Sequence, residues 1–465
     1  MGIAAGVGII VVNAEQKRVD GRPRQAQALD RENGGCRHGA IFTPSATKIR
    51  CLPFSIPIAL SLLLSTIPPA VLRLLFAVLA GCAILALDVW QRPGAPAPAS
   101  APWPVAGAVP DLTVVQVQAQ GEIPMPPGMA AAHASTLLTM PHGDSASLSV
   151  FWFSGDRESG PNVQIAASQY DRSTGQWLPA RFVVNRFVMA EQLGHGLRRL
   201  GNPVAWLDGG GRVNLFVVAT GWGGWAASRI LHLRQSSVGR ELAELAFEPV
   251  RVLPLSWLWN TSFLVRNAPL TLVDGGMVLP VHFELGIKYP IALRFDKDGG
   301  YLGMVRLSQR PYLLQPSLVM ESPQAWFALM RDGRPSGKIG VVRTTDGGRH
   351  WSDLPDLTLD NPDAAVAGLG LTPGQMLLAH NSSIASRGTL DQSRSADGHT
   401  WALVKTLERG GYDDEYSYAA MAWVDGSLWV TYTVDRQRIA WQRLVGAPAL
   451  PAGVLTETDS RSTKP

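Results

Sequence analysis

The chain has 465 residues, of which 46% are hydrophobic and 17% are charged, so we expect one large or two ordinary folded domains and not a disordered protein. Its net charge of +4 comes without any block of lysine and arginine, which argues against a nucleic-acid-binding protein, and no nucleic acid is expected as a partner. The cysteines all lie at or before Cys82, which excludes a disulfide framework from the rest of the chain, and we expect no metal or other cofactor.

The first part of the chain contains a candidate membrane anchor. Residues 1–51 begin with a short apolar run, continue with a more polar stretch and lack a sustained period, which predicts a poorly structured extension. Residues 52–90 are strongly apolar but are interrupted by two prolines and an arginine, and one membrane span needs about 20 apolar residues. One span, two close spans and a signal-anchor all fit, and the sequence ending at Cys82 also resembles a lipoprotein cleavage site. Each of these alternatives attaches the chain to a membrane through residues 52–90.

Residues 91–110 are rich in proline and alanine and are predicted to form a linker. Such sequences are extended and act as semi-rigid spacers between a membrane and a domain. An anchor and a spacer followed by a cysteine-free domain indicate a bacterial inner-membrane protein whose domain faces the periplasm. We expect residues 449–465 to form a disordered tail.

Residues 111–448 read as one all-β domain. Short runs of alternating apolar and polar residues are separated by Asp-Gly and Gly-Gly turns, which predicts antiparallel hairpins. One short helix is expected around residues 240–246. Similar strand openings recur near Pro203, Pro269 and Pro316, which favours a propeller over a sandwich or barrel. The 15 tryptophans fit either packing between sheets or a platform on which sugars stack.

A short motif occurs twice on predicted hairpin turns and once in a degraded form. The two copies are Thr344–Trp351 and Ser395–Trp401, and the degraded copy is Ser168–Trp177. In each copy an aspartate can accept hydrogen bonds from the backbone of its own turn, and a tryptophan can pack beneath it. The motif therefore concerns the fold and not the chemistry.

These motifs resemble the Asp boxes of the sialidase-like BNR repeat family, and the chain is most similar to the bacterial predicted-neuraminidase branch of that family. The resemblance covers about residues 125–445 and implies a six-bladed β-propeller. Sialidases bind the sugar carboxylate with three arginines and use a tyrosine as the nucleophile. By resemblance, Arg331 and Arg387 correspond to the second and third arginines, and Tyr418 corresponds to the nucleophile. His133 stands in the place of the first arginine, and Gln315 stands in the place of the glutamate that activates the tyrosine.

Eight charged or nucleophilic residues lie at the ends of predicted inner strands or in the loops beside them. We expect catalytic roles for Tyr418, Glu158, Glu284 and His133, and substrate-binding roles for Arg331, Arg387, Arg266 and Glu415. The simpler alternatives are a surface or blade-bridging role for a lone arginine and a solvated loop charge for Glu415.

The resemblance implies a sialidase-like exo-glycoside hydrolase that acts on an acidic glycan. A polysaccharide lyase, a glycosidase for another acidic sugar and a non-catalytic carbohydrate-binding propeller are the alternatives.

Overall fold

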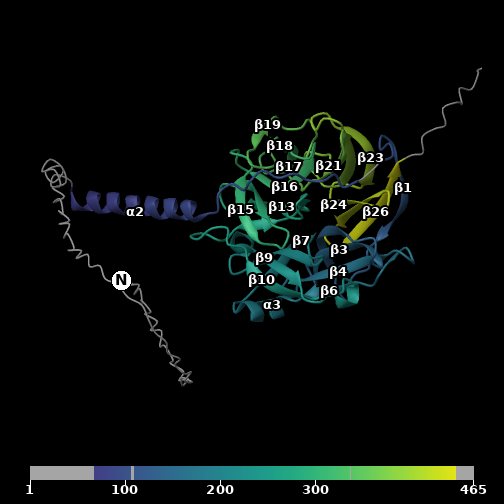
Figure 1. Ribbon diagram of the computed structural model, residues 1–465, viewed down its shortest axis with the longest axis horizontal. Helices are drawn as coiled ribbons and strands as arrows, with labels where there is room; N and C mark the ends of the chain where they lie inside the picture. The colour runs from purple at the N-terminus through teal and green to yellow at the C-terminus, as the bar shows by residue number, and fades with distance from the viewer. Residues whose placement is uncertain (1–67, 106–108, 336, 447–465) are drawn as a thin grey trace, which may run out of the picture. The chain divides into compact units, whose positions relative to one another are not determined.

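The structure, a computed structural model, describes residues 68–105, 109–335 and 337–446. The extension expected over residues 1–51, the apolar residues 52–67 and the tail expected over 449–465 lie outside the described residues. In the described part, the apolar helix α2 (Pro69–Gln91) is followed by a domain of six antiparallel sheets (Figure 1). The expectation of an all-β, six-bladed propeller is therefore confirmed.

The six sheets are arranged in a ring as the blades of a propeller (Figure 1), and residues from the inner strands of all six line a central cavity, which we call the central channel. The first blade contains β2 (Ala131–Thr139), β3 (Ala146–Gly155), β4 (Gln164–Asp171), β5 (Gln176–Trp177) and β6 (Arg181–Val184). The second contains β7 (Arg199–Leu207), β8 (Val213–Thr220), β9 (Ser228–Gln235) and β10 (Phe247–Val252). The third contains β11 (Phe263–Val265), β12 (Leu270–Thr271), β13 (Met277–Phe283), β14 (Tyr289–Phe295) and β15 (Tyr301–Arg306).

The remaining three blades complete the ring. The fourth contains β16 (Leu313–Met320), β17 (Trp326–Asp332), β18 (Ile339–Thr344) and β19 (Ser352–Leu354). The fifth contains β20 (Ala367–Thr372), β21 (Gln375–Asn381), β22 (Thr389–Ser395) and β23 (Ala402–Arg409). The sixth contains β24 (Tyr416–Val424), β25 (Ser427–Val434), β26 (Arg438–Gly446) and β1 (Val115–Glu122).

Strand β1 closes the ring. It comes first in the domain but pairs antiparallel with β26, the last strand of the chain, with Val115 opposite Gly446 and Glu122 opposite Ala440. Because one blade combines both ends of the domain, the ring cannot open without breaking this ladder.

The large aromatic side chains hold the blades together. Trp152, Trp206, Trp326 and Trp429 are each at most 2% exposed. Each of these four tryptophans is a member of a hydrophobic cluster that also contains side chains from other strands. Of the two interpretations of the tryptophan content, packing between sheets therefore applies to these four.

The Asp boxes form the turns that follow the third strand of a blade. In the turn between β18 and β19, Oδ1 of Asp346 accepts from the backbone N–H groups of Arg349 and His350 at 3.1 and 2.9 Å. In the turn between β22 and β23, Asp397 accepts from His399 and Thr400 at 2.8 and 2.7 Å. Because successive strands run in opposite directions, these turns lie at the end of the blades opposite to the start of the inner strands.

The degraded box and the expected helix had different outcomes. Asp171 accepts from the backbone N–H groups of Ser173 and Thr174, so the degraded copy has kept the turn. The prediction of a helix around residues 240–246 is wrong, because this segment forms only the 3-10 turn η2 (Leu242–Glu244). A second 3-10 turn, η1 (Gly224–Ala227), lies between β8 and β9. Helix α3 (Arg186–Leu193) was not predicted; it begins where the side chain of Asn185 accepts from the N–H groups of Phe187 and Val188.

The middle of the linker lies against the propeller. The N–H of Ala99 donates to the carbonyl of Gly347 at 3.1 Å, and the N–H of Ala101 donates to the carbonyl of Pro323 at 2.8 Å. Ala101 is fully buried. This stretch is therefore held on the domain by backbone hydrogen bonds and does not act as a free spacer, since small alanine side chains let the two backbones approach closely.

Candidate active site at one end of the central channel

Four inner strands are interrupted at the same place, close to their first residues. The pairing shifts register at residues 133–136 in β2, 201–204 in β7, 314–317 in β16 and 417–420 in β24. These are β-bulges, which turn a side chain away from its normal alternation. We call this end of the blades, where the inner strands begin, the site end.

Each bulge contains a residue with left-handed backbone geometry. The φ angles are 55° at Ala134, 40° at Asn202, 51° at Gln315 and 56° at Tyr418. Left-handed geometry is uncommon for a bulky residue such as tyrosine, and residues held in it cluster at active sites. A bulge residue makes no ladder hydrogen bond, so the sequence can place a proline directly after Asn202 and Gln315 without loss.

The bulges bring three side chains together around the ring of Tyr418. The imidazole of His133 lies with its centroid 4.3 Å from that of the tyrosine ring. The amide nitrogen of Gln315 donates to the phenolic oxygen at 3.4 Å. The guanidinium carbon of Arg266 lies 5.0 Å from the ring centroid. Tyr418 itself is half-buried, so its ring belongs to the wall of the channel mouth.

Two of the expected arginines meet at Asp363. Arg331, near the end of β17, binds the carboxylate of Asp363 through Nε and through Nη2, the latter at 3.0 Å. Arg387, in the loop before β22, donates through Nη2 to the main-chain carbonyl of the same residue at 2.9 Å. Burial lowers the pKa of Arg331, but the neighbouring Asp363 and Tyr418 raise it overall, so the guanidinium stays charged.

Glu415 links Arg387 to the loops around the channel mouth. Its Oε1 accepts from Nη1 of Arg387 at 3.0 Å and from the hydroxyl of Ser417 at 2.7 Å. Its Oε2 accepts from Arg436 at 2.7 Å, and Arg436 also donates to Glu158 at 2.7 Å. Burial raises the pKa of Glu415, but the hydrogen bonds from Ser417 and Arg436 outweigh it and lower the pKa to about 2. The carboxylate is therefore a charged, ordered partner and not a solvated loop charge.

Glu284 approaches the same group of residues from the third blade. Its Oε2 lies 3.7 Å from Nε2 of the buried His282. The nearby imidazole of His282 is the main cause that lowers the pKa of Glu284, and the charges of Lys288 and Arg331 act in the same direction. Its link to the rest of the site is the electrostatic attraction of Arg331.

His133 and Arg266 lie deeper than the other members. Burial, aided by neighbouring arginines and opposed by Glu415, lowers the pKa of His133 to about 3, so its ring is neutral at pH 7. Its Nδ1 is buried and has no hydrogen-bond partner among the described residues. Arg266 is 2% exposed and donates to the carbonyls of Ser135 and Ala419 at 3.3 and 2.8 Å. This burial argues against the expected substrate-binding role of Arg266, because its donors brace β2 and β24.

The structure therefore brings all eight expected residues to the site end. His133, Arg266 and Tyr418 are in direct contact, and the remaining five connect to them through shared partners or charge. Asp363 and Arg436 also belong to the site, although neither was predicted from the sequence. Both occur in irregular turns, and Arg436 has a φ of 57° in the β25–β26 hairpin, so neither carries a motif or a period that would reveal it.

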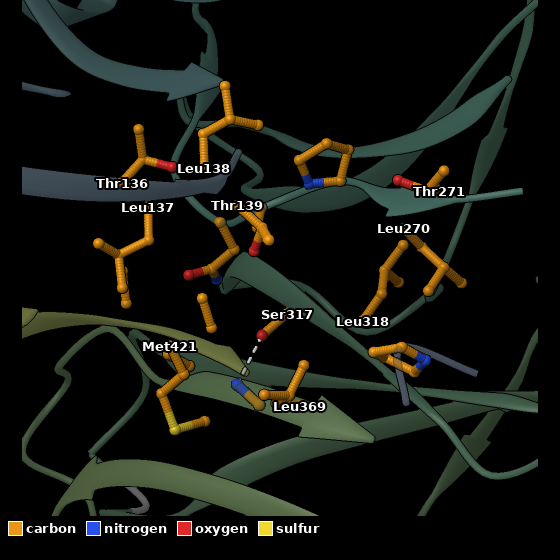
Figure 2. Close-up of a pocket in the computed structure, with 18 of the residues that line it drawn as sticks. Thr136, Leu137, Leu138, Thr139, Leu270, Thr271, Ser317, Leu318, Leu369 and Met421 are labelled. Atoms are coloured by element: carbon orange, nitrogen blue, oxygen red, sulfur yellow. Dashed lines mark hydrogen bonds between the residues drawn. The ribbon is translucent and has the colours of Figure 1, made fainter. Parts of the chain in front are cut away.

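A cavity of about 480 Å³ occupies the channel beyond this cluster. Figure 2 shows its walls, which are the inner strands with side chains such as Thr136, Leu318 and Met421, and a hydrogen bond from Gly368 N to Ser317 Oγ at 2.8 Å. Arg266 is shared between the cavity and the cluster, whereas Tyr418 and Arg331 do not line the cavity. The cavity is largely apolar, so the chemistry belongs to the charged site end and not to this larger space.

Comparisons with solved structures return propellers with low sequence identity. The Hadza microbial sialidase Hz136 is 18% identical, with a TM-score of 0.53, and the match covers 67% of this chain and 65% of that one. A protein of unknown function from Dyadobacter fermentans is 13% identical, with a TM-score of 0.54 and coverage of 72% and 99%. A Trypanosoma rangeli sialidase, solved with the inhibitor DANA, is 11% identical, with a TM-score of 0.54 and coverage of 70% and 58%.

The chain thus spans less than two thirds of the length of these two sialidases. A search of curated protein sequences gave no match. At the family level, residues 146–430 match the BNR repeat-like domain. This match covers more than half of the chain and includes both Asp boxes. The chain belongs to the BNR repeat-like domain family and has the fold of the sialidases.

Proposed function

We propose that this chain is a sialidase-like exo-glycoside hydrolase that removes an acidic sugar from the end of a glycan. The observation that carries the proposal is the meeting of Arg331, Arg387 and Tyr418 at the site end through shared partners. A Trypanosoma rangeli sialidase that shares the fold has been solved with sialic acid, which carries a carboxylate. Two ordered guanidinium groups beside a half-buried phenol fit a sugar of that kind.

In the proposed reaction, Arg331 and Arg387 bind the carboxylate of the substrate. Asp363 and Glu415 hold the two guanidinium groups in place before the substrate arrives, so little side-chain freedom is lost on binding. The same carboxylates offset the positive charge of the two guanidinium groups. An anionic substrate repels a carboxylate nucleophile, whereas the neutral phenol of Tyr418 can approach it.

Tyr418 acts as the nucleophile. Its phenolic oxygen forms a bond to the anomeric carbon while the glycosidic bond breaks, and the phenolic proton passes to the leaving oxygen. Glu158, paired with Arg436, and Glu284, whose pKa is lowered, are carboxylates and supply charge at the site end. The ring of His133, 4.3 Å from the tyrosine ring, packs against the phenol. Because burial lowers its pKa to about 3, His133 positions Tyr418 and does not act as the base. Water then hydrolyses the tyrosyl–sugar bond: its oxygen and one hydrogen remain on the sugar, and its second proton returns to the phenolic oxygen of Tyr418. Gln315 orients the phenolic oxygen but, being an amide, cannot accept its proton.

The test is hydrolysis of a fluorogenic α-sialoside and of uronide and sulfated-sugar analogues by the full chain. Tyr418→Phe removes the nucleophile, and we expect the turnover to fall by at least about 10³-fold. Arg331→Ala is expected to raise KM more than it lowers kcat, because it removes a contact with the substrate carboxylate. Tyr416→Phe, two residues away on the same strand, is the matched control and is expected to keep full activity. Unchanged turnover in both site variants would disprove this mechanism.

One observation favours a second function. The amide of Gln315 takes the place in which the resemblance implies a catalytic glutamate, which fits a carbohydrate-binding propeller that no longer turns over its ligand. Binding to a glycan array without release of sugar would support that alternative. An unsaturated product would instead indicate a lyase in which His133 and Tyr418 act as base and acid.

We also propose that α2 anchors the chain in a bacterial inner membrane, with the propeller in the periplasm. The helix has 23 residues and a hydropathy of 2.5 in its most apolar window, which is long and apolar enough to cross a bilayer. No cysteine follows Cys82 in the sequence, so the domain needs no particular redox compartment. Resistance of the chain to alkaline extraction from membranes, together with protease access to the propeller from the periplasmic side, is the expected result.

A further inference from the structure

The last turn of α2 is fixed to the propeller by a buried carboxylate. Asp88 is 3% exposed, and its Oδ1 accepts from the hydroxyl of Ser256 and from the backbone N–H of Leu258, both at 2.9 Å. Arg92 donates to the same carboxylate through Nε at 3.2 Å. A buried carboxylate with three donors is a specific attachment, so the end of α2 has a defined neighbour, which is the loop between β10 and β11.

That loop exposes large apolar side chains beside the end of the helix. Trp257 is 62% exposed, Leu258 is 43% exposed and Trp259 is 52% exposed. Trp90, on α2 itself, is 81% exposed. We call these four residues and Ile287, which is 66% exposed, the tryptophan patch.

Ile287 comes from the neighbouring β13–β14 loop and is placed near the others by Tyr289. Burial raises the pKa of Tyr289 and the nearby charge of Arg92 lowers it, and Arg92 also donates to Asp88. The three elements that carry the patch therefore meet around one arginine. Exposed apolar side chains that gather from separate elements indicate a surface that another phase or molecule covers.

The loop is built to keep its tryptophans outside. The hydroxyl of Ser256 accepts from the N–H of Trp259 at 2.8 Å, and the side chain of Asn260 both accepts from Leu255 N at 3.1 Å and donates to the carbonyl of Leu253 at 2.8 Å. These bonds fix the backbone on both sides of the exposed residues. The exposure of Trp257 and Trp259 is thus a property of an ordered loop.

We propose that the tryptophan patch rests in the headgroup region of the same bilayer that α2 crosses. This inference depends on the anchoring proposed above. A spanning helix ends at the membrane interface, and Trp90 lies one residue before the end of α2. Tryptophan prefers that interface because its ring is apolar and its indole N–H can still bond to water or headgroups.

The arrangement also fixes which end of the propeller faces the membrane. The β10–β11 loop precedes an inner strand, and the β13–β14 loop joins a second strand to a third, so both lie at the site end. A patch seated in the interface holds this end of the blades at the membrane surface. The linker, which packs on the opposite turns, then plays no part in setting the distance to the bilayer.

The test uses the full chain in vesicles of neutral and anionic phospholipid, with and without lipids brominated near the headgroup, which quench tryptophan fluorescence at short range. Subtracting the emission of the double variant Trp257→Ser/Trp259→Ser from that of the wild type gives the emission of these two patch tryptophans. We expect brominated lipid to lower this emission at least about twofold. The matched control is Trp401→Phe, which removes a partly buried tryptophan in an Asp box at the opposite end of the blades. The emission of Trp401, obtained by the same subtraction, is expected to be equal with and without brominated lipid.

Alkaline extraction of the same vesicles separates the two proposals. If the chain resists extraction but the patch emission is not quenched, the patch proposal is wrong and the anchor stands. If the chain is extracted and there is no quenching, both are wrong. If a soluble glycan or a protein, and not brominated lipid, changes the patch emission, the partner is a different one and the proposal is overturned. The proposed hydrolase activity has a separate test, the turnover of Tyr418→Phe. A failure of that proposal is therefore distinguishable from each of these three outcomes.

Discussion

Acidification from pH 7 to pH 5 should destabilise this propeller through its buried histidines. Burial lowers the pKa of His133 and of His232 from 6.5 to about 3. In the unfolded chain these imidazoles take up protons below about pH 6.5, whereas in the folded chain they stay neutral down to about pH 3. The unfolded state therefore binds more protons in this window, so the stability falls as the pH falls.

The magnitude follows from the width of the window. Between pH 7 and pH 5, one histidine that stays neutral when folded costs about 2 kcal/mol of unfolding free energy, so the pair costs about 4 kcal/mol. Burial also lowers the pKa of His380, which acts in the same direction. Glu415 contributes little here because its carboxyl ordinarily titrates near 4.5, below the window. A loss of this size is a large part of the stability of a typical domain.

Urea unfolding of the full chain at pH 7, 6 and 5, followed by tryptophan fluorescence, measures the effect. His133→Gln should remove about half of the pH dependence, whatever it does to the stability at pH 7. His142→Gln, which removes an imidazole that is 91% exposed, should leave the pH dependence unchanged. A wild-type stability that is equal at pH 7 and pH 5 would refute the reasoning, as would an unchanged slope in His133→Gln.

Three further predictions concern the turns, the site and the linker. Asp346→Ala and Asp397→Ala each remove a carboxylate that accepts from two backbone N–H groups. We expect the free energy of unfolding in urea to fall by about 1–2 kcal/mol in each variant while kcat stays unchanged. A loss of activity without a loss of stability would contradict this prediction. Asp363→Ala leaves Arg331 without its bidentate partner, so inhibition by a free sugar acid should weaken severalfold while Tm changes little. In Gly347→Ala the new Cβ would meet linker backbone at 2.2 Å at a φ of +68°, so limited proteolysis should cut the linker faster than in wild type, and equal rates would exclude the docking.

Much of the fold was readable from the chain because local patterns carry it. Strand alternation, Asp-Gly turns and two boxes with Asp346 and Asp397 each depend on residues close together in sequence, and they are sufficient for a repeated four-stranded unit. The apolar region before the linker is equally local. Helix α3 has a local signal in its asparagine cap, but the helix has only eight residues, so the signal was missed. At residues 240–246 the propensity for a longer helix was not sufficient.

The eight candidate residues could be proposed from their positions at strand ends, but their arrangement could not. Only the ring closure by β1 and β26 and the bulges at the site end bring His133 to the ring of Tyr418, although 285 residues separate them in the chain. Asp363 and Arg436 entered the site without a sequence signal, and Arg266 proved to be a buried brace. Contacts between distant residues depend on how blades pack and where strands bulge, and no short-range pattern encodes either.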